Sequence, residues 1–421
     1  MTQLNAPKGT YDLLPKELLK WYYLVDKIHL LFKQYGYGEL RTPIFEYTEL
    51  FQRGIGETTD IVEKEMFTFP DRAGRSLTLR PEGTASIVRA FLEHNMAGSG
   101  GIQKLYYYGP MFRCEAPQAG RFRQFVQFGA EVLGSEDPRV DAEIITIAVN
   151  FYQRLGIQDL DVNLNSIGCP ECRPLYRTRL IEHLRPKADK LCPNCQRRLE
   201  RNPLRLLDCK SPICQSLTAD VPLITETLCD SCGTHFSKLR QLLDAIGIKY
   251  RLNPRLVRGF DYYTKTVFEV LAGDLGAQNA LCGGGRYDGL VEECGGRPTP
   301  GIGFAAGVER LIMVLNARNL WPELSRKPQI FLAPLGEKAQ MALFPIVIQL
   351  REAGWEVETD YQGRSLKAQL KTADKLGVPF VGVLGEDELA KGQILIRRMN
   401  TSDQEIISLN DLDGFLKINY N

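Results

Sequence analysis

The spacing of apolar side chains predicts one long helix followed by a series of short strands. Apolar residues recur every three or four positions over Pro15–Tyr35, a proline stands in the first turn and Gly36 follows, so we expect a helix that ends there. A second helix is expected at 139–155. Runs rich in β-formers lie at 40–45, 66–69, 76–79, 104–109, 123–133 and 266–271. Few helices separate these runs, which indicates an antiparallel sheet.

The pattern changes after residue 326, where strands and helices alternate. Strands are expected at 330–333, 356–359, Phe380–Leu384 and 394–397, and helices at 339–353 and 365–376. Alternation of this kind predicts a compact α/β module with parallel strands.

Length and composition narrow the class of protein. At roughly 100–200 residues per domain, a chain of 421 residues has several domains. With 44% hydrophobic and 24% charged residues it is neither disordered, collagen-like nor a coiled coil. The net charge of +1 argues against a general DNA-coating or membrane-surface protein. No apolar run approaches about 18 residues and no apolar signal core opens the chain, so we expect a cytoplasmic protein without membrane contact.

Cysteines concentrate in one stretch. Eight of the eleven are Cys169, Cys172, Cys192, Cys195, Cys209, Cys214, Cys229 and Cys232. An odd total and the absence of an export signal disfavour disulfides, whereas three C-x-x-C pairs have the spacing with which two thiolates hold a tetrahedral metal ion. We expect structural Zn²⁺ on Cys192, Cys195, Cys229 and Cys232, with the other four as a second site. The alternative is a set of small residues buried in a tight local fold.

Two other features of this stretch have more than one explanation. Residues 171–210 carry 11 Lys and Arg against 5 Asp and Glu, an excess that can attract nucleic acid but also suits a solvated helical surface. The four histidines do not fall in metal-ligand spacing, apart from a link of His235 with Cys232.

An arginine-rich hairpin is the strongest candidate for ligand chemistry. Arg113, Arg121 and Arg123 lie in or beside the loop between two predicted strands. Guanidinium groups suit a polyphosphate, because each offers a fork of donors that stays charged. Alternation on the second strand places Gln127 and Glu131 on one face, with Gly129 leaving a gap between them for a small ligand. A purely structural role for these arginines is the alternative.

Three further segments combine polar groups with glycine. Glu82 and Thr84 begin a predicted helix, where the carboxylate could hold an amino group or only favour the first turn. In the segment 255–263, Arg258, Tyr262 and Tyr263 surround a glycine. In the segment 282–288, three glycines precede Arg-Tyr-Asp, and these glycines would let the backbone approach a ligand closely.

Known nucleotide-binding patterns do not account for these residues. Residues 301–307 match the dinucleotide fingerprint G-x-G-x-x-A, but Thr299-Pro300 precedes them instead of a buried strand, and no acidic strand end follows about 20 residues on. The Walker pattern is absent. Any ATP must then be held by arginines on an antiparallel sheet.

Five motifs together resemble the histidyl-tRNA synthetase family of class II aminoacyl-tRNA synthetases, over nearly the whole chain. Arg41-Thr42-Pro43 is similar to the dimer-interface motif 1, residues 111–131 to motif 2, and residues 301–310 to motif 3. Residues 256–263 and 284–288 are similar to the two histidine-specific motifs. The resemblance implies an α+β fold, in which an antiparallel sheet forms the catalytic domain and a C-terminal α/β domain binds the anticodon.

The same resemblance implies a role for each site residue. Arg258 and Arg113 would be catalytic, and Arg113, Arg121 and Arg310 would bind ATP. Histidine would be bound by Glu82, Thr84, Gln127, Glu131, Tyr262, Tyr263 and Tyr287. Mg²⁺ would bridge the phosphates of ATP, the partners would be histidine, ATP and the tRNA for histidine, and the protein would be a homodimer.

Domain boundaries follow from the motifs. Residues 1–167 and 251–325 would form the catalytic domain, 168–250 an inserted cysteine-rich domain, and 326–421 the anticodon-binding domain. The cysteines depart from the simplest family pattern, which needs no metal in the insertion. In the last domain, Arg364, Lys367, Lys371 and Lys375 share one face of a predicted helix and could bind phosphate or form a plain solvated face.

One non-catalytic class competes with this interpretation. The regulatory subunit of ATP phosphoribosyltransferase resembles the same fold and binds histidine without activating it, but it lacks the C-terminal module. The presence of that module here, together with Arg113, Arg258 and Arg310, favours the synthetase. A zinc-ribbon nucleic-acid binder is a weaker alternative, because the cysteines occupy only a small part of the chain.

Overall fold

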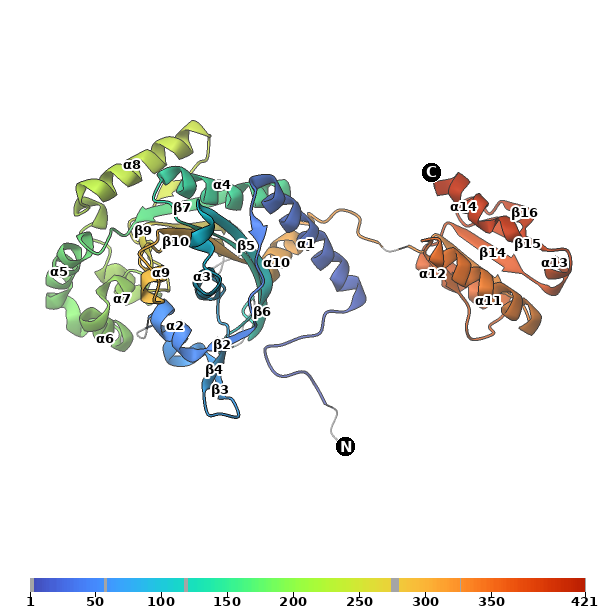
Figure 1. Cartoon of the computed structure of the whole chain (residues 1–421), viewed down its shortest axis with the longest axis horizontal. Helices are drawn as coiled ribbons and strands as arrows, with labels where there is room; N and C mark the ends of the chain where they lie inside the picture. Colours follow the sequence, from blue (N-terminus) through green and yellow to red (C-terminus); the bar gives the residue numbers. More distant parts are fainter. Residues whose placement is uncertain (1–3, 57–58, 117–119, 274–279, 326, 421) are drawn as a thin grey trace. The chain divides into compact units, whose positions relative to one another are not determined.

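The computed structural model describes residues 4–56, 59–116, 120–273, 280–325 and 327–420. It divides the chain into two compact units, Met1–Pro322 and Glu323–Asn421 (Figure 1). Residues 117–119 of the predicted arginine loop and residue 326, the predicted start of the last domain, lie outside the described residues. Within the described residues, no helix is both long and apolar enough to cross a membrane.

An eight-stranded sheet forms the centre of the first unit, in the order β1-β5-β6-β11-β10-β9-β7-β8. Its strands are β1 (Gly38–Glu39), β5 (Gln103–Phe112), β6 (Gln124–Leu133), β7 (Leu160–Ser166), β8 (Arg251–Leu252), β9 (Thr264–Ala272), β10 (Ala280–Arg286) and β11 (Gly301–Gly307). The six central strands pair antiparallel, and only the two short edge strands pair parallel. The predicted antiparallel sheet is confirmed.

The predicted strand at 40–45 is wrong. β1 ends at Glu39, and β2 (Phe45–Tyr47) begins at the last predicted position. The residues between them are irregular for two reasons. Pro43 has no N–H to donate to a strand, and the Thr42 carbonyl accepts a hydrogen bond from the Arg80 guanidinium at 3.0 Å. β2 pairs with β4 (Ser76–Leu79), which also pairs with β3 (Phe67–Pro70), in a small separate sheet.

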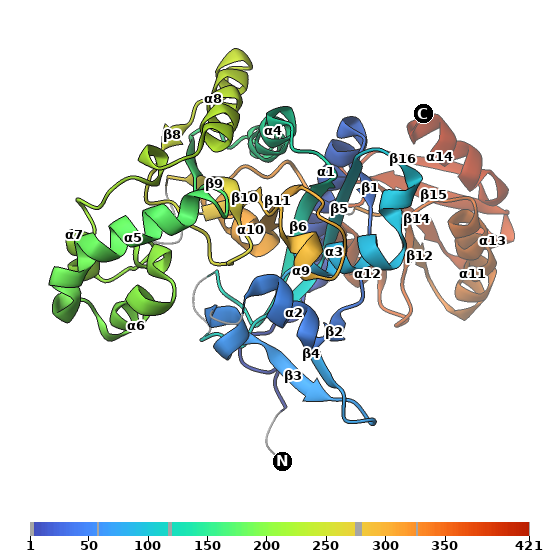
Figure 2. The same cartoon turned by 60° about the vertical axis from the view of Figure 1, so that its left-hand side comes forward.

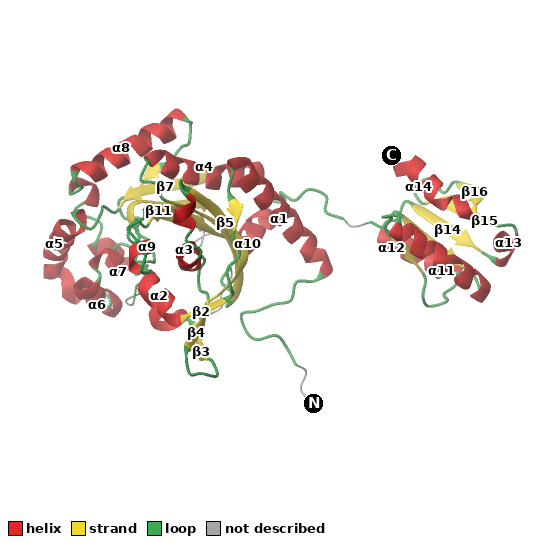
Figure 3. Cartoon of the chain, viewed as in Figure 1, coloured by secondary structure: helices red, strands yellow, loops and turns green. Residues whose placement is uncertain are grey.

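Helices cover one face of the large sheet. α1 (Pro15–Tyr35), α4 (Pro138–Arg154) and α10 (Val308–Ala317) share one apolar core with β6, β9 and β11 (Figure 3). α1 has the predicted limits, because Glu17 accepts the Leu14 N–H at 3.1 Å and Gly36 ends the helix with φ at 73°. The shorter helices α2 (Thr48–Ile55), α3 (Thr84–Glu93) and α9 (Leu290–Glu293) pack against one another.

In the segment between β7 and β8, all of which the structure describes, helices and 3₁₀ turns are the only regular elements. The segment contains α5 (Cys172–Leu184), α6 (Pro193–Arg201), α7 (Pro212–Leu217) and α8 (Asp230–Ala245), with 3₁₀ turns that include η4 (Pro203–Leu206). Because β7 and β8 are neighbours, the segment leaves the sheet and returns to it at the same edge (Figure 2). Its own core of leucines, with Tyr176 and two cysteines, continues into the aromatic loop around residue 262.

The second unit is an α/β module with the sheet order β13-β12-β14-β15-β16. Its elements are β12 (Ile330–Pro334), α11 (Glu337–Glu352), β13 (Val357–Thr359), α12 (Leu366–Leu376), β14 (Phe380–Leu384), α13 (Glu386–Ala390), β15 (Gln393–Arg398), β16 (Gln404–Ser408) and α14 (Leu412–Tyr420). β12 is parallel to β13 and β14, as predicted, but β15 is antiparallel to β14. The link from Leu384 to Gln393 is shorter than the dozen or more residues of a parallel crossover.

Candidate active site

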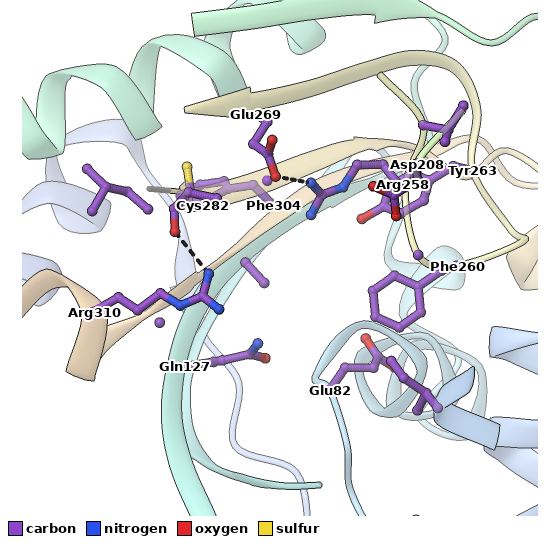
Figure 4. Close-up of a pocket in the computed structure, with 18 of the residues that line it drawn as sticks. Glu82, Gln127, Asp208, Arg258, Phe260, Tyr263, Glu269, Cys282, Phe304 and Arg310 are labelled. Carbon is purple, nitrogen blue, oxygen red and sulfur yellow. Dashed lines mark hydrogen bonds and ion pairs between the residues drawn. The ribbon is translucent and has the colours of Figure 1, made fainter. Parts of the chain in front are cut away.

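A cavity of about 510 Å³ lies against the large sheet, between its central strands and the helical insertion. All but one of the predicted site residues line it: Glu82, Thr84, Arg113, Arg121, Gln127, Arg258, Tyr262, Tyr263, Tyr287 and Arg310. Figure 4 labels several of them, with Gln127, Arg258 and Arg310 around the same space. The fold therefore brings together residues from four of the five sequence motifs. The motif at residues 41–43 does not line the cavity.

Arginines from three elements surround one part of the cavity. Arg113 follows β5, donates from Nε to the Pro81 carbonyl at 3.0 Å, and stacks over the Phe125 ring at 5.3 Å from its centroid. Arg121 pairs with Glu115 at 2.9 Å. Arg310, on α10, donates to the Ala280 carbonyl at 3.1 Å. These contacts use only some of the guanidinium N–H groups, so the arginines are held in place with donors left for an anion.

Arg258 is fixed by two contacts. Its Nη1 donates to Glu269 Oε1 at 2.9 Å, and its carbonyl accepts from Arg205 Nη1 at 3.1 Å. Its Nε is buried and has no hydrogen-bond partner among the described residues. Burial alone would lower the pKa of Arg258, but the Glu269 carboxylate, together with Tyr263 and Cys282, raises it above its usual value. A permanent cation with a free N–H is therefore held at the cavity wall.

Gly283 makes room for that cation. A Cβ at this position would overlap the Arg258 guanidinium, and Cβ atoms at Gly284 and Gly285 would meet backbone carbonyls of the two neighbouring strands. Gly283 also lines the cavity, so the approach of a ligand to this backbone stays a prediction, but the glycine triplet already has a structural role. It lets a side chain and the adjacent strands pack closely against β10.

Glu82 and Glu131 differ in what they contact. The nearly fully buried Glu82 accepts the backbone N–H groups of Thr84 at 2.6 Å and Ala85 at 2.8 Å, which caps the start of α3. The first-turn role is thus present, and the residue also lines the cavity. Burial raises the pKa of Glu82.

Glu131 is the predicted site residue that does not line the cavity. It lies below the surface, where Oε1 accepts from the Thr84 hydroxyl at 2.7 Å and Oε2 from the Tyr287 hydroxyl at 2.5 Å. Burial raises the pKa of Glu131 to about 8. Its contacts orient two residues that do line the cavity.

The gap predicted over Gly129 is already filled. A Cβ at Gly129 would lie within 2.5 Å of the Tyr107 hydroxyl, so Tyr107, and not a ligand, occupies that space. The ligand face begins at Gln127, whose Oε1 is buried without a partner among the described residues. Beyond it, the rings of Tyr262 and Tyr263 lie 4.6 Å apart and those of Tyr262 and Tyr287 lie 5.8 Å apart, which makes an aromatic end to the cavity.

Sequence reasoning missed several charged groups that line the cavity, among them Glu269, Asp208 and Lys210. Glu269 is the only acidic residue of β9, and its place in the apolar second half of that strand was a usable signal. Asp208 and Lys210 come from the helical insertion, and nothing in their local pattern indicated that they reach the site.

His235 belongs to a buried ion-pair network and not to a cysteine cluster. Its Nε2 lies 3.0 Å from Asp141 Oδ1, and Asp141 in turn binds Arg286, with Oδ2 at 2.6 Å from Nη2. Asp141 and Arg286 are fully buried. The predicted link of His235 with Cys232 is therefore wrong, because the imidazole of His235 is hydrogen-bonded to Asp141. The network joins α4, α8 and β10.

The predicted pairing of cysteines is also wrong. The groups that the structure brings together are Cys169, Cys172, Cys229 and Cys232, and separately Cys192, Cys195, Cys209 and Cys214. In the first group, two pairs 60 positions apart meet because the chain leaves and re-enters the sheet at one edge. In the second, the short loop after α6 folds back on itself. Within each group the sulfur atoms all lie within 4.8 Å of one another.

The comparisons with known proteins identify the family to which this fold belongs. A mostly antiparallel sheet whose cavity is lined by arginines, in a chain that also has a separate α/β unit, is the arrangement of a class II aminoacyl-tRNA synthetase. The profile of the histidyl-tRNA synthetase family matches residues 9–171 and 219–311, and that of an anticodon binding domain matches residues 329–419.

Individual relatives match over the full length. A histidine–tRNA ligase of Desulforamulus reducens is 52% identical over 413 residues, which cover 98% of this chain and 99% of the relative. One of Desulfitobacterium hafniense is 53% identical over 410 residues, 97% of each chain. The apo histidyl-tRNA synthetase of S. aureus superposes with a TM-score of 0.84 at 37% identity, over 99% of this chain and 100% of that one. The chain therefore belongs to the histidyl-tRNA synthetase family.

Proposed function

We propose that the cavity over the large sheet is where this chain joins histidine to ATP. As a member of its family, the chain is a histidine–tRNA ligase. It forms histidyl-adenylate and pyrophosphate, and then transfers histidine to the 3′ end of its tRNA. The observation that carries the assignment to this cavity is that anion-binding arginines and an aromatic, carboxylate-backed pocket line one continuous space of about 510 Å³.

The triphosphate would lie along Arg113, Arg121 and Arg310. Arg113 would contact the α-phosphate and Arg310 the far end, since each is already oriented by a backbone carbonyl. Mg²⁺ would enter with ATP and neutralise part of the charge of its phosphates. The carboxylates of Glu115 and Glu269 line the same cavity and are the oxygen ligands that this ion prefers.

Histidine would lie with its imidazole among Tyr262, Tyr263 and Tyr287. The unpartnered Oε1 of Gln127 and the Glu82 carboxylate would accept hydrogen bonds from the ammonium group. Glu131 would act from below, by holding Thr84 and Tyr287 in place. In this arrangement Glu131 does not contact histidine itself. The sequence resemblance, by contrast, implied that all seven predicted residues bind histidine directly.

Activation then requires positioning and charge neutralisation, and no protein nucleophile. A carboxylate oxygen of histidine attacks the α-phosphorus in line, the bond from that phosphorus to the bridging oxygen breaks, and pyrophosphate leaves with the electron pair. Arg258 would stabilise the charge that develops on the α-phosphate oxygens, because its cation is fixed before the reaction by Glu269.

The second unit would bind the anticodon arm of the tRNA. Lys367, Lys371 and Lys375 are exposed on α12 at four-residue intervals, as the stripe prediction requires. Arg364 is not free to join them, because it binds Asp360 at 2.5 Å and Thr372 at 3.0 Å. The phosphate-binding stripe is therefore proposed for the three lysines alone.

We also propose that the protein is a cytoplasmic homodimer. The small sheet that follows the motif at residues 41–43 exposes apolar side chains: Ile44 is 44% exposed, Phe45 48%, Tyr47 52% and Phe69 41%. Apolar side chains gathered on one exposed sheet are typical of a protein interface.

Histidine-dependent exchange between ATP and pyrophosphate tests the proposed site chemistry. Purified protein should catalyse exchange with histidine and with no other standard amino acid at comparable efficiency. Binding of histidine without exchange would contradict the proposal and favour the regulatory-subunit class. That class lacks an anticodon-binding module, whereas residues 329–419 of this chain match one.

A further inference from the structure

Two groups of four cysteines lie outside the catalytic mechanism. We call Cys169, Cys172, Cys229 and Cys232 the base cluster, because it closes the insertion where the chain leaves and rejoins the sheet. We call Cys192, Cys195, Cys209 and Cys214 the wall cluster, because Cys209 stands between Asp208 and Lys210, which line the catalytic cavity.

The sulfur positions fit a tetrahedral metal ion and not disulfides. Cys169 Sγ lies 3.6 Å from Cys172 Sγ and 3.9 Å from Cys229 Sγ, and Cys192 Sγ lies 3.9 Å from Cys209 Sγ. A disulfide requires about 2.05 Å. Four sulfurs at about 2.3 Å from one central zinc ion would be separated by about 3.8 Å. The observed separations match the second geometry in both clusters.

Backbone groups around the sulfurs also favour thiolates. The Cys229 N–H donates to Cys172 Sγ at 3.1 Å, and the Cys192 N–H donates to Cys214 Sγ at 3.3 Å. Cys229 and Cys192 each stand immediately before the first residue of a helix, α8 and α6. Amide donors and helix N-termini stabilise negative charge on sulfur. Both clusters thus have the ligand set and the surroundings of a closed structural zinc site.

We propose that the insertion binds two zinc ions, one in each cluster, and that the ion of the wall cluster holds one wall of the catalytic cavity in place. All four ligands of each site come from protein, so neither ion would have an open position for a substrate. The chemical class of the ligand is a divalent, thiolate-preferring cation, and tetrahedral S₄ geometry selects zinc.

The wall cluster is connected to the active site through the short segment that it encloses. Between Cys195 and Cys209, Arg198 binds Asp60 at 2.8 Å and Asn202 binds Asp261 at 2.8 Å. Arg205 in the same segment donates to the Arg258 carbonyl at 3.1 Å. Beyond the end of α6 at Arg201, the segment has only one turn of 3₁₀ helix, η4, and no strand to hold it. A metal ion at its two ends would therefore limit its motion and, with it, the position of the Arg258 backbone.

The base cluster has a different place. Its pairs lie at the start of α5 and of α8, next to β7, and Lys265 of β9 donates to the Gly168 carbonyl at 2.8 Å. None of its cysteines lines the catalytic cavity. Its ion would close the insertion and would contribute mainly to stability.

Metal analysis of the full-length protein, purified without chelators, tests the sites independently of activity. We expect two zinc atoms per chain and no stoichiometric iron, with X-ray absorption showing four sulfur ligands per zinc at about 2.3 Å. A zinc content near zero, iron in place of zinc, or a sulfur count well below four would overturn the proposal. This measurement needs no variant and stands even if the proposed reaction is wrong.

Paired variants test the separate roles of the two clusters. Cys209→Ser with Cys214→Ser removes two wall ligands, and Cys169→Ser with Cys172→Ser removes two base ligands. Cys294→Ser changes a cysteine outside both clusters and serves as control. We expect each double variant to lose one zinc atom and the control to keep both. Retention of two zinc atoms by either double variant would contradict the assignment of ligands.

The kinetic part of the proposal rests on the proposed function. At a temperature where circular dichroism shows both double variants folded, the wall variant should lose about tenfold or more in kcat/KM for pyrophosphate exchange, on the scale of other supporting groups around metal sites. The base variant should keep nearly wild-type kinetics and melt at a lower temperature. Equal kinetic losses in both would overturn the positioning role, and wild-type protein without exchange would refute the proposed function while the zinc count still decides the metal sites.

Discussion

The large sheet and the helical insertion hold their side chains in place by different means. In the sheet, Gln127 on β6 and Glu269 on β9 sit on strands that backbone hydrogen bonds fix on both sides. Within residues 168–250, all of which the structure describes, there is no strand, and α6 and α7 are short. Yet Asp208 and Lys210 of this segment line the same cavity.

The difference indicates where each region is vulnerable. A strand residue keeps its direction even when a neighbour is changed, because the ladder of backbone bonds remains. Short helices are marginal by themselves and depend on tertiary contacts. In the insertion these contacts are a small apolar core, ion pairs to the catalytic part, and the two cysteine clusters.

The largest expected effect is on the network that joins the two regions. Asp141→Asn removes the charge that both Arg286 and His235 contact, and leaves the fully buried Arg286 guanidinium with only the more distant Asp288 carboxylate, at 3.2 Å. Breaking a buried pair in this way costs about 3–5 kcal/mol. Chemical denaturation should show that loss, with the exposed Asp244→Asn on α8 as control. A loss no larger than that of the control would mean that the two regions are joined mainly by apolar packing.

The next effect concerns the residue at which the two regions meet in the active site. Arg258→Ala should reduce adenylate formation by about 10²–10³-fold, the scale for loss of a preorganised charge stabiliser. Arg258→Lys should restore activity only in part, because an ammonium group lacks the guanidinium fork. Single-turnover histidine activation measures both, with Arg251→Ala on the exposed edge strand as control. Near-normal activation in the alanine variant would refute the role assigned to Arg258.

The third effect is a change of stability with pH, which tests the sheet alone. In the unfolded chain the pKa of Glu131 would be about 4.3, whereas burial raises it to about 8 in the fold. Between these values the folded protein holds one more proton, so its stability should fall as pH rises from about 5 to about 8, by at most about 1.4 kcal/mol per pH unit. Glu131→Gln should flatten this part of the pH profile of unfolding. An unchanged profile would show that Glu131 is ionised throughout that range.

The smallest effect lies in the second unit, where no buried group is involved. Reversing Lys367 and Lys371 to Glu should raise KM for tRNA by less than about tenfold and lower its dependence on salt, because exposed phosphate contacts act through counterion release. Pyrophosphate exchange with histidine should be nearly unchanged. The double variant Lys338→Glu with Lys391→Glu serves as control, because it makes the same change in net charge at exposed positions elsewhere on the unit. If both pairs alter KM equally, the stripe is not a specific contact.

The sequence by itself determined the features that depend on neighbours along the chain. The limits of α1 follow from apolar spacing, a proline in the first turn and a glycine at the end, all within one segment. The alternating strands and helices of the second unit could be predicted from the sequence for the same reason. Four of the five motifs likewise named residues that line the cavity, because each motif is a short continuous run.

Tertiary structure alone decided the features that depend on which distant segments meet. The pairing of cysteines follows from the adjacency of β7 and β8, which no C-x-x-C spacing encodes. The gap at Gly129 is closed by Tyr107 from the neighbouring strand, and the room at Gly283 is taken by Arg258. In each case the outcome was set by strand register and side-chain volume across the fold, and these arise only when residues far apart in sequence are packed together.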